Sequence, residues 1–212
     1  MRYAAASDQG ANTLTVTTGS MTLAKDQAYG SQSIVVPINA YKIGQWVLSG
    51  SSTEDVNLDT IQVDLAFASG FAAADLTNIY VVYGTKTSAL KASSSATAGA
   101  NTWSISQVLP KNTSMTFAFY GDMASAATDG GAADTVIPSL LVSGTTASSA
   151  TAVNTNSNAV LAGQTITAVS TGTLTVSLDN GTPQAAIAVA GATPTDGSLK
   201  VKLASSNEDM YV

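Results

Sequence analysis

Apolar and polar residues alternate along most of this chain with a period of two. The pattern is plain at residues 13–17, 55–65 and 114–120. Because successive side chains of a β-strand point to opposite faces, such alternation places one face on a core and leaves the other in water. Helix is expected only in a short turn near residues 72–76. Strands are predicted at residues 13–17, 33–38, 45–48, 55–65, 78–83, 103–106, 114–120, 135–142, 164–169, 172–178, 185–189 and 199–203.

The spacing of these strands predicts an all-β fold. They follow one another about 8–12 residues apart, with Gly, Ser and Asn between them, which is typical of a sandwich or barrel. Residues 93–100, 124–133 and 145–159 are small and polar, so we expect loops there. The predicted core consists of Leu14, Val16, Val35, Trp46, Val56, Leu58, Ile61, Val63, Val81, Trp103, Ile105, Phe117 and Phe119.

A short internal repeat links the two ends of the chain. Residues 13–16 recur at 173–176, and residues 51–56 recur in similar form at 205–210. The second match places the two glutamates of the protein at equivalent positions, and an apolar segment lies between the matches in each copy. Chance similarity in a chain rich in Ala, Ser and Thr is the alternative explanation.

The repeat predicts a domain organisation. Residues 1–11 are an N-terminal tail, 12–144 a β-sandwich module, 145–171 a linker or crossover strand, and 172–212 the opening strands of a second, incomplete sandwich repeat. Two or three strands leave unpaired backbone groups and an uncovered apolar face. Residues beyond 212, the first module, or strands from a neighbouring subunit could cover this face. The expected assembly residues are Thr173, Leu174, Val176, Ile187, Val189, Leu199, Val201 and Leu203.

The tail and the middle of the chain carry a family resemblance. The tail reads Gly172-Thr173-Leu174-Thr175-Val176-Ser177-Leu178-Asp179 and later Lys200-Val201-Lys202-Leu203-Ala204-Ser205-Ser206-Asn207-Glu208-Asp209. With residues 75–84 and 109–117, these segments resemble the repeat unit of large surface proteins of ultra-small candidate-phyla bacteria, over roughly residues 12–148 and 172–212. The resemblance implies an immunoglobulin-like antiparallel β-sandwich in a tandem array at the cell surface, and it brings no catalytic residues.

Composition narrows the function classes. The chain has neither His nor Cys, so it holds no Ser-His-Asp or Cys-His nucleophile and no imidazole or thiolate metal site. We therefore expect that it is not an enzyme. With 8 Lys and Arg against 14 Asp and Glu, and a net charge of -6, nucleic acid is not an expected partner. The most apolar stretches are far shorter than the roughly 20 residues of a spanning helix, so no membrane insertion is expected in this segment.

Calcium is the one cofactor that the sequence suggests, because Ca²⁺ needs only oxygen ligands. Glu54, Asp55 and Asp59 gather in one copy of the repeat, and Glu208 and Asp209 in the other. None of them has the spacing of a calcium-binding loop. The alternative is a strand face turned to solvent, because Asp55 and Asp59 alternate with apolar residues. No other cofactor is expected.

The sequence as a whole predicts an extracellular structural protein, a subunit or segment of a cell-surface filament, stalk or surface layer. Its partner is expected to be itself, in a homo-oligomer or polymer built by strand sharing or serial packing of modules. The alternative is an adhesin or glycan-binding sandwich module, including a phage fibre or decoration protein. Trp46 and Trp103 lie in alternating patterns that favour the core over a glycan platform, while Tyr80 and Tyr83 fall on opposite faces of one strand.

Overall fold

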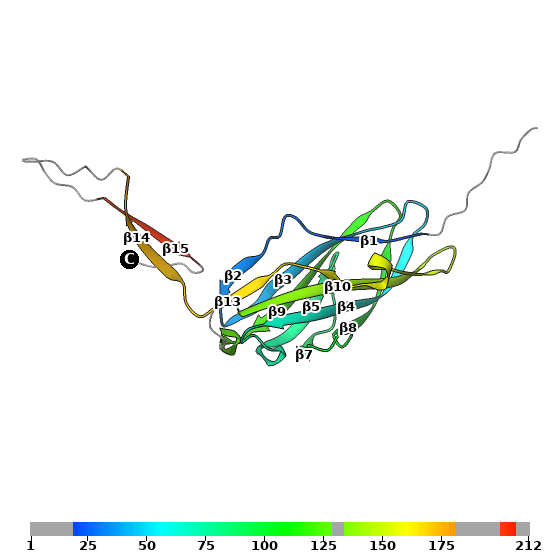
Figure 1. Ribbon diagram of the computed structural model, residues 1–212. Helices are drawn as coiled ribbons and strands as arrows, with labels where there is room; N and C mark the ends of the chain where they lie inside the picture. Colours follow the sequence, from blue (N-terminus) through cyan, green and yellow to red (C-terminus); the bar gives the residue numbers. More distant parts are fainter. Residues whose placement is uncertain (1–18, 129–133, 181–199, 207–212) are drawn as a thin grey trace, which may run out of the picture.

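Two β-sheets pack face to face in the main body of the molecule, and a separate two-stranded sheet follows near the C-terminus (Figure 1). The computed structural model describes residues 19–128, 134–180 and 200–206. Sheet A runs in the order β1 (Thr22–Lys25), β3 (Ile38–Ser49), β9 (Ser114–Met123), β5 (Leu76–Tyr83) and β6 (Lys86–Thr87), with β7 (Lys91–Ser93) also paired to β5. Sheet B runs in the order β2 (Gln32–Val35), β13 (Ile166–Val169), β10 (Asp134–Thr146), β4 (Val56–Ala68) and β8 (Thr102–Leu109), with β11 (Ala152–Asn154) and β12 (Leu161–Ala162) also paired to β10.

Antiparallel pairing dominates both sheets. Among the described strands, only β2 and β13 run parallel, at one edge of sheet B. Within the part of the chain that the structure describes, helix is confined to three short 3₁₀ turns, η1 (Ala73–Asp75), η2 (Ser125–Thr128) and η3 (Thr155–Asn158). This confirms the predicted all-β fold with an antiparallel β-sandwich, while the partial second repeat stays a prediction.

The core lies between the two sheets and is built mainly from aromatic and branched side chains. Trp46, Phe117 and Phe119 are completely buried, and Trp103 packs edge-on against Phe119 with ring centroids 6.4 Å apart. Nine of the predicted core residues are buried: Trp46, Val56, Leu58, Ile61, Val63, Val81, Trp103, Phe117 and Phe119. Ile105 is partly buried against the core, and Leu14 and Val16 lie outside the described residues.

The predicted strand at 33–38 differs from the structure in its length and its inward face. Ile34 and Val36 are buried, whereas Val35, which we expected in the core, is only partly buried. The strand ends at Val35, and β3 begins at Ile38 after Pro37. Proline has no N–H to donate to a ladder, which agrees with the break between β2 and β3 at Pro37. The run of apolar residues carries no alternation that could have set the inward face.

A β-bulge explains how β4 keeps its apolar residues inward although their spacing changes. Val56 and Leu58 are buried, and so are Ile61 and Val63, which lie on the opposite phase of the alternation. On the β10 side the register shifts between Ser143 and Gly144, which leaves one extra residue in β4 between Leu58 and Thr60. An extra residue reverses the side to which the strand's next side chains point. Both halves of β4 therefore face the core.

Residues 145–169 belong to the sandwich, so of the two predictions for this segment, a linker and a crossover strand, the linker does not agree with the structure. β10 continues to Thr146, and β11, β12 and β13 pair with it in turn. Small polar residues can form these ladders because the hydrogen bonds come from the backbone. The buried polar side chains of Thr155 and Gln164 then fix the segment, with Thr155 Oγ1 accepting the N–H of Val142 at 3.1 Å.

Gln164 closes one side of the sandwich. Its side chain is completely buried, and its Oε1 accepts the backbone N–H of Gln45 at 2.9 Å. Its Nε2 donates to the backbone oxygens of Tyr29 at 2.7 Å, Gln45 at 3.1 Å and Asp26 at 3.2 Å. One amide thus joins the β12–β13 segment of sheet B to β3 and the β1–β2 connection.

The opposite side of the sandwich is closed by the segment that carries β6 and β7. Trp103 Nε1, on the edge strand β8, donates to the backbone oxygen of Ala89 at 2.7 Å. Lys86 Nζ donates to the backbone oxygen of Ser106 at 3.0 Å, and Lys91 Nζ lies 5.6 Å from the centroid of a Trp103 ring. Both sides of the sandwich are thus closed by contacts between described residues.

The third sheet is a hairpin of two six-residue strands, β14 (Thr173–Leu178) and β15 (Val201–Ser206). Figure 1 shows it projecting from the end of the sandwich at which β13 finishes. In the part of the chain that the structure describes, no helix is both long and apolar enough for a membrane crossing.

Candidate assembly surface

The β14–β15 hairpin carries one apolar face and one polar face. The register pairs Val176 with Leu203 and Leu178 with Val201, so these four side chains lie on the same side of the ribbon. Leu174 extends that side by alternation along β14. We call these five residues the apolar face: Leu174, Val176, Leu178, Val201 and Leu203.

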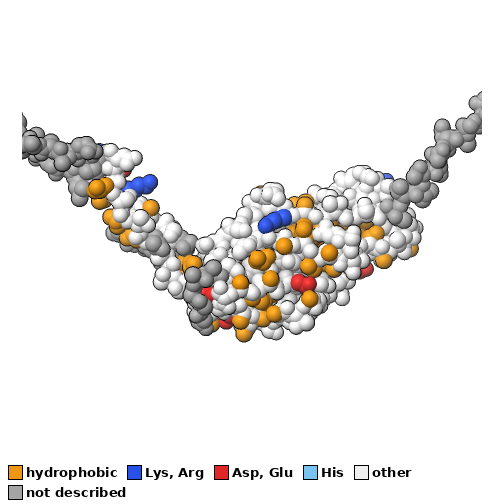
Figure 2. All heavy atoms as spheres, in the orientation of Figure 1, with side chains coloured by type: hydrophobic (Ala, Val, Ile, Leu, Met, Phe, Trp, Pro, Cys, Tyr) orange, Lys and Arg blue, Asp and Glu red, His pale blue; other side chains and the backbone are white. Residues whose placement is uncertain are grey.

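Nothing in the described sandwich covers the apolar face. Its side chains are between 41% exposed, at Leu174, and 65% exposed, at Leu178. Figure 2 shows hydrophobic side chains following the hairpin on the face in view. These are five of the eight large hydrophobic side chains that are exposed among the described residues. Exposed apolar residues are therefore concentrated on this element.

The opposite face of the hairpin is polar. It carries Thr175 and Ser177 on β14, with Lys202, Ala204 and Ser206 opposite on β15. A two-stranded ribbon is at best marginally stable alone in water. Covering five half-exposed Leu and Val side chains would contribute on the order of 5 kcal/mol, which is comparable to the stability of a small domain. Covering this face would therefore stabilise the hairpin.

The structure describes four of the eight predicted assembly side chains. Leu174, Val176, Val201 and Leu203 lie together on the apolar face, while Thr173 begins β14. Ile187, Val189 and Leu199 lie outside the described residues. Leu178 belongs to the same face but was missing from the prediction. Its position two residues after Val176, in the same alternating run, was the signal that could have identified it.

Glu54 lies in the turn between β3 and β4, and its carboxylate joins three segments of the sandwich. One carboxylate oxygen accepts the N–H of Gly19 at 3.0 Å and the Ser149 hydroxyl at 2.7 Å. The other accepts the N–H of Ser148 at 2.9 Å and that of Ser149 at 3.0 Å. The hydrogen bonds from the Ser149 hydroxyl and backbone, with those from Gly19 and Ser148, lower the pKa of Glu54 to about 2.

The other acidic candidates do not join Glu54 in a metal cluster. Asp55 Oδ1 accepts the N–H of Lys111 at 2.8 Å, and Asp59 is exposed at the bulge of β4. Glu54, Asp55 and Lys111 line a shallow open hollow of about 170 Å³. Within the described ranges, no group of three or more His, Cys, Asp or Glu could hold a metal ion. Glu208 and Asp209 lie outside them, so calcium stays a prediction.

A row of polar and aromatic side chains crosses the outer face of sheet A. Tyr80 and Tyr120 are paired in register on β5 and β9, and their rings stack at 5.2 Å with an interplanar angle of 4°. Lys42 of β3 pairs with Tyr120 on its other side. Next to them, Asp122 accepts the Ala40 N–H at 2.6 Å and the Asn78 amide at 2.7 Å. Burial raises the pKa of Tyr80.

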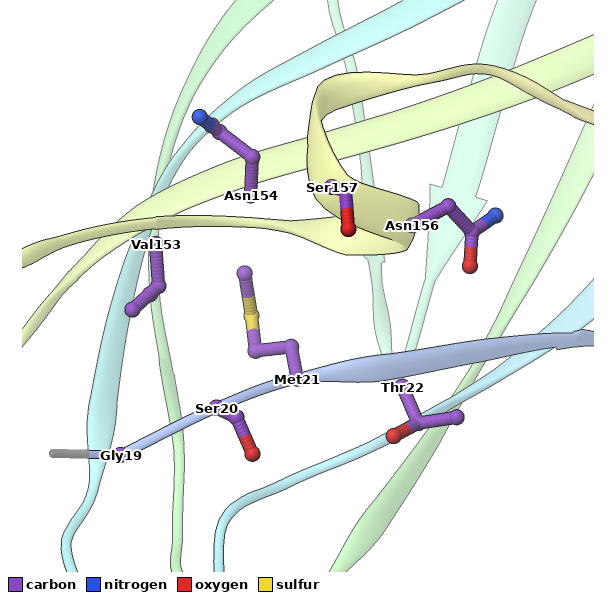
Figure 3. A pocket seen from close by; sticks show the side chains of 8 residues that line it. All are labelled: Gly19, Ser20, Met21, Thr22, Val153, Asn154, Asn156 and Ser157. Atoms are coloured by element: carbon purple, nitrogen blue, oxygen red, sulfur yellow. The ribbon is translucent and has the colours of Figure 1, made fainter. Parts of the chain in front are cut away.

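A groove runs between the start of β1 and the β11–η3 segment (Figure 3). Its volume is about 430 Å³. In Figure 3 the side chain of Met21, the residue before β1, points toward Val153 and Ser157, while Ser20 and Thr22 point the other way. The rest of the lining is amide and hydroxyl groups, with no titratable side chain among the described residues.

Comparisons with known proteins place this chain in no family. No family model matches it, and no curated protein matches it. Among solved structures, it is similar to the CssB subunit of colonization factor CS6 of enterotoxigenic Escherichia coli, complemented with a donor strand from the CssA subunit. The two share 13% sequence identity with a TM-score of 0.29, over 71% of this chain and 97% of that chain. A likeness of this size says nothing about function.

Proposed function

We propose that this chain is an extracellular structural protein, a subunit or segment of a cell-surface filament, stalk or surface layer, which assembles through the β14–β15 hairpin. The observation that carries the proposal is the apolar face of that hairpin, which the sandwich leaves uncovered. The role is mechanical, and no chemical reaction is part of it.

The hairpin combines two features that suit strand sharing. Its apolar face offers side-chain contacts, and the outer edges of β14 and β15 carry backbone groups that pair with no other described strand. A strand added to such an edge gains main-chain hydrogen bonds and apolar contacts together. The two sheets of the sandwich also end in edge strands, but only three of the eight exposed large hydrophobic side chains among the described residues lie in the sandwich.

The placement of the hairpin favours an open assembly. In Figure 1 the start of β1 and the hairpin lie at opposite ends of the sandwich. A contact between one end of a subunit and the other end of the next is heterologous, and it propagates as a filament unless its rotation closes a ring. The low charged fraction of the chain, 10%, lets uncharged Ser, Thr and Ala surfaces approach closely.

Charge placed on either face of β14 tests this proposal. In the full chain, Val176→Lys with Leu178→Lys puts two charges on the apolar face, while Thr175→Lys with Ser177→Lys puts the same two charges on the polar face of the same strand. We expect the unaltered protein and the polar-face variant to form ordered oligomers by light scattering and negative-stain electron microscopy. The apolar-face variant should remain as single chains.

Near-ultraviolet circular dichroism provides the folding control, because Trp46 and Trp103 report on the core of the sandwich. Assembly of the apolar-face variant to the same extent as the unaltered protein would show that the hairpin is not the contact.

The tyrosine row on sheet A favours a second candidate function, a glycan-binding adhesin module. Stacked Tyr80 and Tyr120, with Lys42, Asp122 and Asn78 around them, place apolar rings beside hydrogen-bonding groups, the combination that a sugar ring requires. Glycan-array binding that disappears in Tyr80→Ala, and persists in Thr116→Ala on the same face of β9, would support this function. The absence of saturable binding on the array would contradict the glycan-binding function.

A further inference from the structure

We infer that the groove beside β1 receives the hairpin of a second copy of this chain. In this contact, β14 of one chain adds to the outer edge of β1 of the next, and its apolar side chains enter the groove. The inference rests on the proposed function, because it takes the hairpin as the assembling element and names the surface that accepts it.

The outer edge of β1 offers backbone groups for a further strand. β1 pairs with β3 and with no other described strand. The N–H of Asp26 donates to the backbone oxygen of Gln45 at 3.1 Å, so in the alternating antiparallel ladder the backbone groups of Ala24 also face β3. Those of the alternate residues, Leu23 and Lys25, therefore point away from β3, where an added strand would lie.

The groove lies on the inward side of this edge. Leu23 pairs with Leu48, and both side chains are buried, so Leu23 marks the inward face of β1. Met21, two residues earlier, continues this face and lines the groove, and in Figure 3 its side chain points toward Val153. Because side chains alternate along a strand, every second side chain of an added strand would lie beside Met21. These side chains would enter the groove.

The apolar side chains of β14 suit the groove in number, size and charge. Leu174, Val176 and Leu178 follow one another along one side of β14, whereas β15 contributes only Val201 and Leu203 to that face. The groove volume of about 430 Å³ is roughly three times that of a cavity that binds benzene, so it has room for two or three such side chains. Neither β14 nor the lining carries a charged side chain, so no ion is desolvated on contact.

The other edge strands of the sandwich suit the hairpin less. β6 is only two residues long. The segment that carries β6 and β7 crosses to β8, where Lys86 Nζ donates to the Ser106 oxygen and Trp103 Nε1 to the Ala89 oxygen. β2 lies at the end of the sandwich from which the chain's own hairpin projects, while β1 starts at the opposite end (Figure 1). A contact between hairpin and β1 edge is therefore heterologous and can repeat from chain to chain.

Mixing two altered full chains tests the inference. Asn156→Asp with Ser157→Asp charges the groove and leaves the hairpin intact. Both positions have a positive φ, 49° and 55°, which Asp adopts more readily than most residues. Val176→Asp with Leu178→Asp charges the hairpin and leaves the groove intact. The charges have the same sign, so the two altered surfaces do not attract each other.

We expect each variant alone to remain as single chains, measured by size-exclusion chromatography with light scattering. An equal mixture of the two should form heterodimers that grow no further, because each heterodimer uses the one intact hairpin and the one intact groove. Thr97→Asp with Ala98→Asp, on an exposed loop that does not line the groove, is the matched control and should form the same oligomers as the unaltered protein. Near-ultraviolet circular dichroism checks that the sandwich of each variant is folded.

Normal assembly of the groove variant, with the hairpin variant remaining as single chains, would overturn the inference and keep the hairpin as the assembling element. Dimers of the groove variant alone would mean that hairpin pairs with hairpin, and they would also overturn it. Single chains of the unaltered protein at every concentration would contradict the inference and the proposed function together.

Discussion

At the scale of single residues, two polar side chains hold distant segments of the sandwich together. Glu54 accepts hydrogen bonds from the start of β1 and from the β10–β11 turn, and Gln164 joins the β12–β13 segment to β3 and the β1–β2 connection. Both bond mainly to backbone groups, Glu54 to those of Gly19, Ser148 and Ser149, and Gln164 to those of β3 and the β1–β2 connection. Glu54, one of the acidic residues that the sequence suggested for calcium, thus holds loops of the sandwich together.

Replacing Glu54 by Gln should weaken the sandwich and change its response to acid. The pKa of Glu54 is lowered to about 2 from its usual 4.5, so the carboxylate contributes stability that is fully present above pH 4.5 and is lost as the pH falls toward 2. We expect the thermal midpoint of Glu54→Gln to be lower by a few degrees at pH 7 and to fall less between pH 4.5 and 2. Thermal melts followed by circular dichroism across this range measure both effects.

Asp59→Asn, at an exposed carboxylate on β4, is the matched control and should leave the midpoint unchanged. An acid response of Glu54→Gln identical to that of the unaltered protein would show that the carboxylate does not hold these segments.

Gln164→Leu should be strongly destabilising. The substitution leaves the N–H of Gln45 and the backbone oxygen of Tyr29 without their buried partner, which costs about 2–3 kcal/mol. Urea unfolding measured by tryptophan fluorescence gives the free energy directly. Gln107→Leu, where the amide bonds only to the neighbouring Val108 oxygen, should cost less than about 0.5 kcal/mol. Equal effects of the two substitutions would mean that Gln164 has no special role in closing the sandwich.

At the scale of elements, glycines allow close packing around Trp46. Gly44 precedes it on β3, and Gly163 lies between β12 and β13, with the Trp46 indole nitrogen donating to the Leu161 oxygen at 3.2 Å. A Cβ atom on Gly163 would lie 2.5 Å from Trp46 Cζ2 and 3.0 Å from the Pro138 oxygen. The strands of both sheets approach each other here only because glycine has no side chain.

Gly163→Ala should therefore destabilise the sandwich by about 1–3 kcal/mol through overpacking against Trp46. Gly30→Ala is the control, because a Cβ atom there would meet nothing within 4 Å, so its effect should be neutral or slightly stabilising. Chemical denaturation of both variants makes the comparison. Equal stability of Gly163→Ala and Gly30→Ala would show that the indole of Trp46 can move aside for a Cβ atom at little cost.

At the scale of the whole molecule, the sandwich and the hairpin differ in how much of their apolar surface is buried. The sandwich buries its aromatic residues and closes both of its sides, while every described side chain of the hairpin between residues 174 and 206 that lies in a strand is exposed. The stability of the described molecule therefore resides in the sandwich, and the hairpin is the element through which we propose that it associates.

A fragment of residues 19–171 should unfold in a single cooperative transition with a midpoint within about 3 °C of the full chain. The physical reason is that the hairpin adds no burial to the sandwich core. Differential scanning calorimetry measures both midpoints. The full chain is used as the Val176→Lys, Leu178→Lys variant, so that both samples are single chains. A midpoint lowered by about 10 °C or more would mean that the tail packs on the sandwich.

The sequence by itself determined the features that depend on local chemistry. Alternation of apolar and polar residues was enough for the all-β fold and for most of the core, since side chains on a strand point to alternate faces whatever the strand's partners are. Of the eight residues that it named for assembly, Leu174, Val176, Val201 and Leu203 lie on one face of the hairpin, while their role in assembly stays a prediction. The absence of His and Cys excluded whole classes of sites before any strand was placed.

Only the tertiary structure decided the features that depend on partners distant in sequence. The bulge in β4, the parallel pairing of β2 with β13, and the inclusion of residues 145–169 in sheet B all depend on which strand lies alongside, and local alternation carries no record of that choice. The same holds for Glu54 and Gln164, whose partners are backbone groups without a sequence signature.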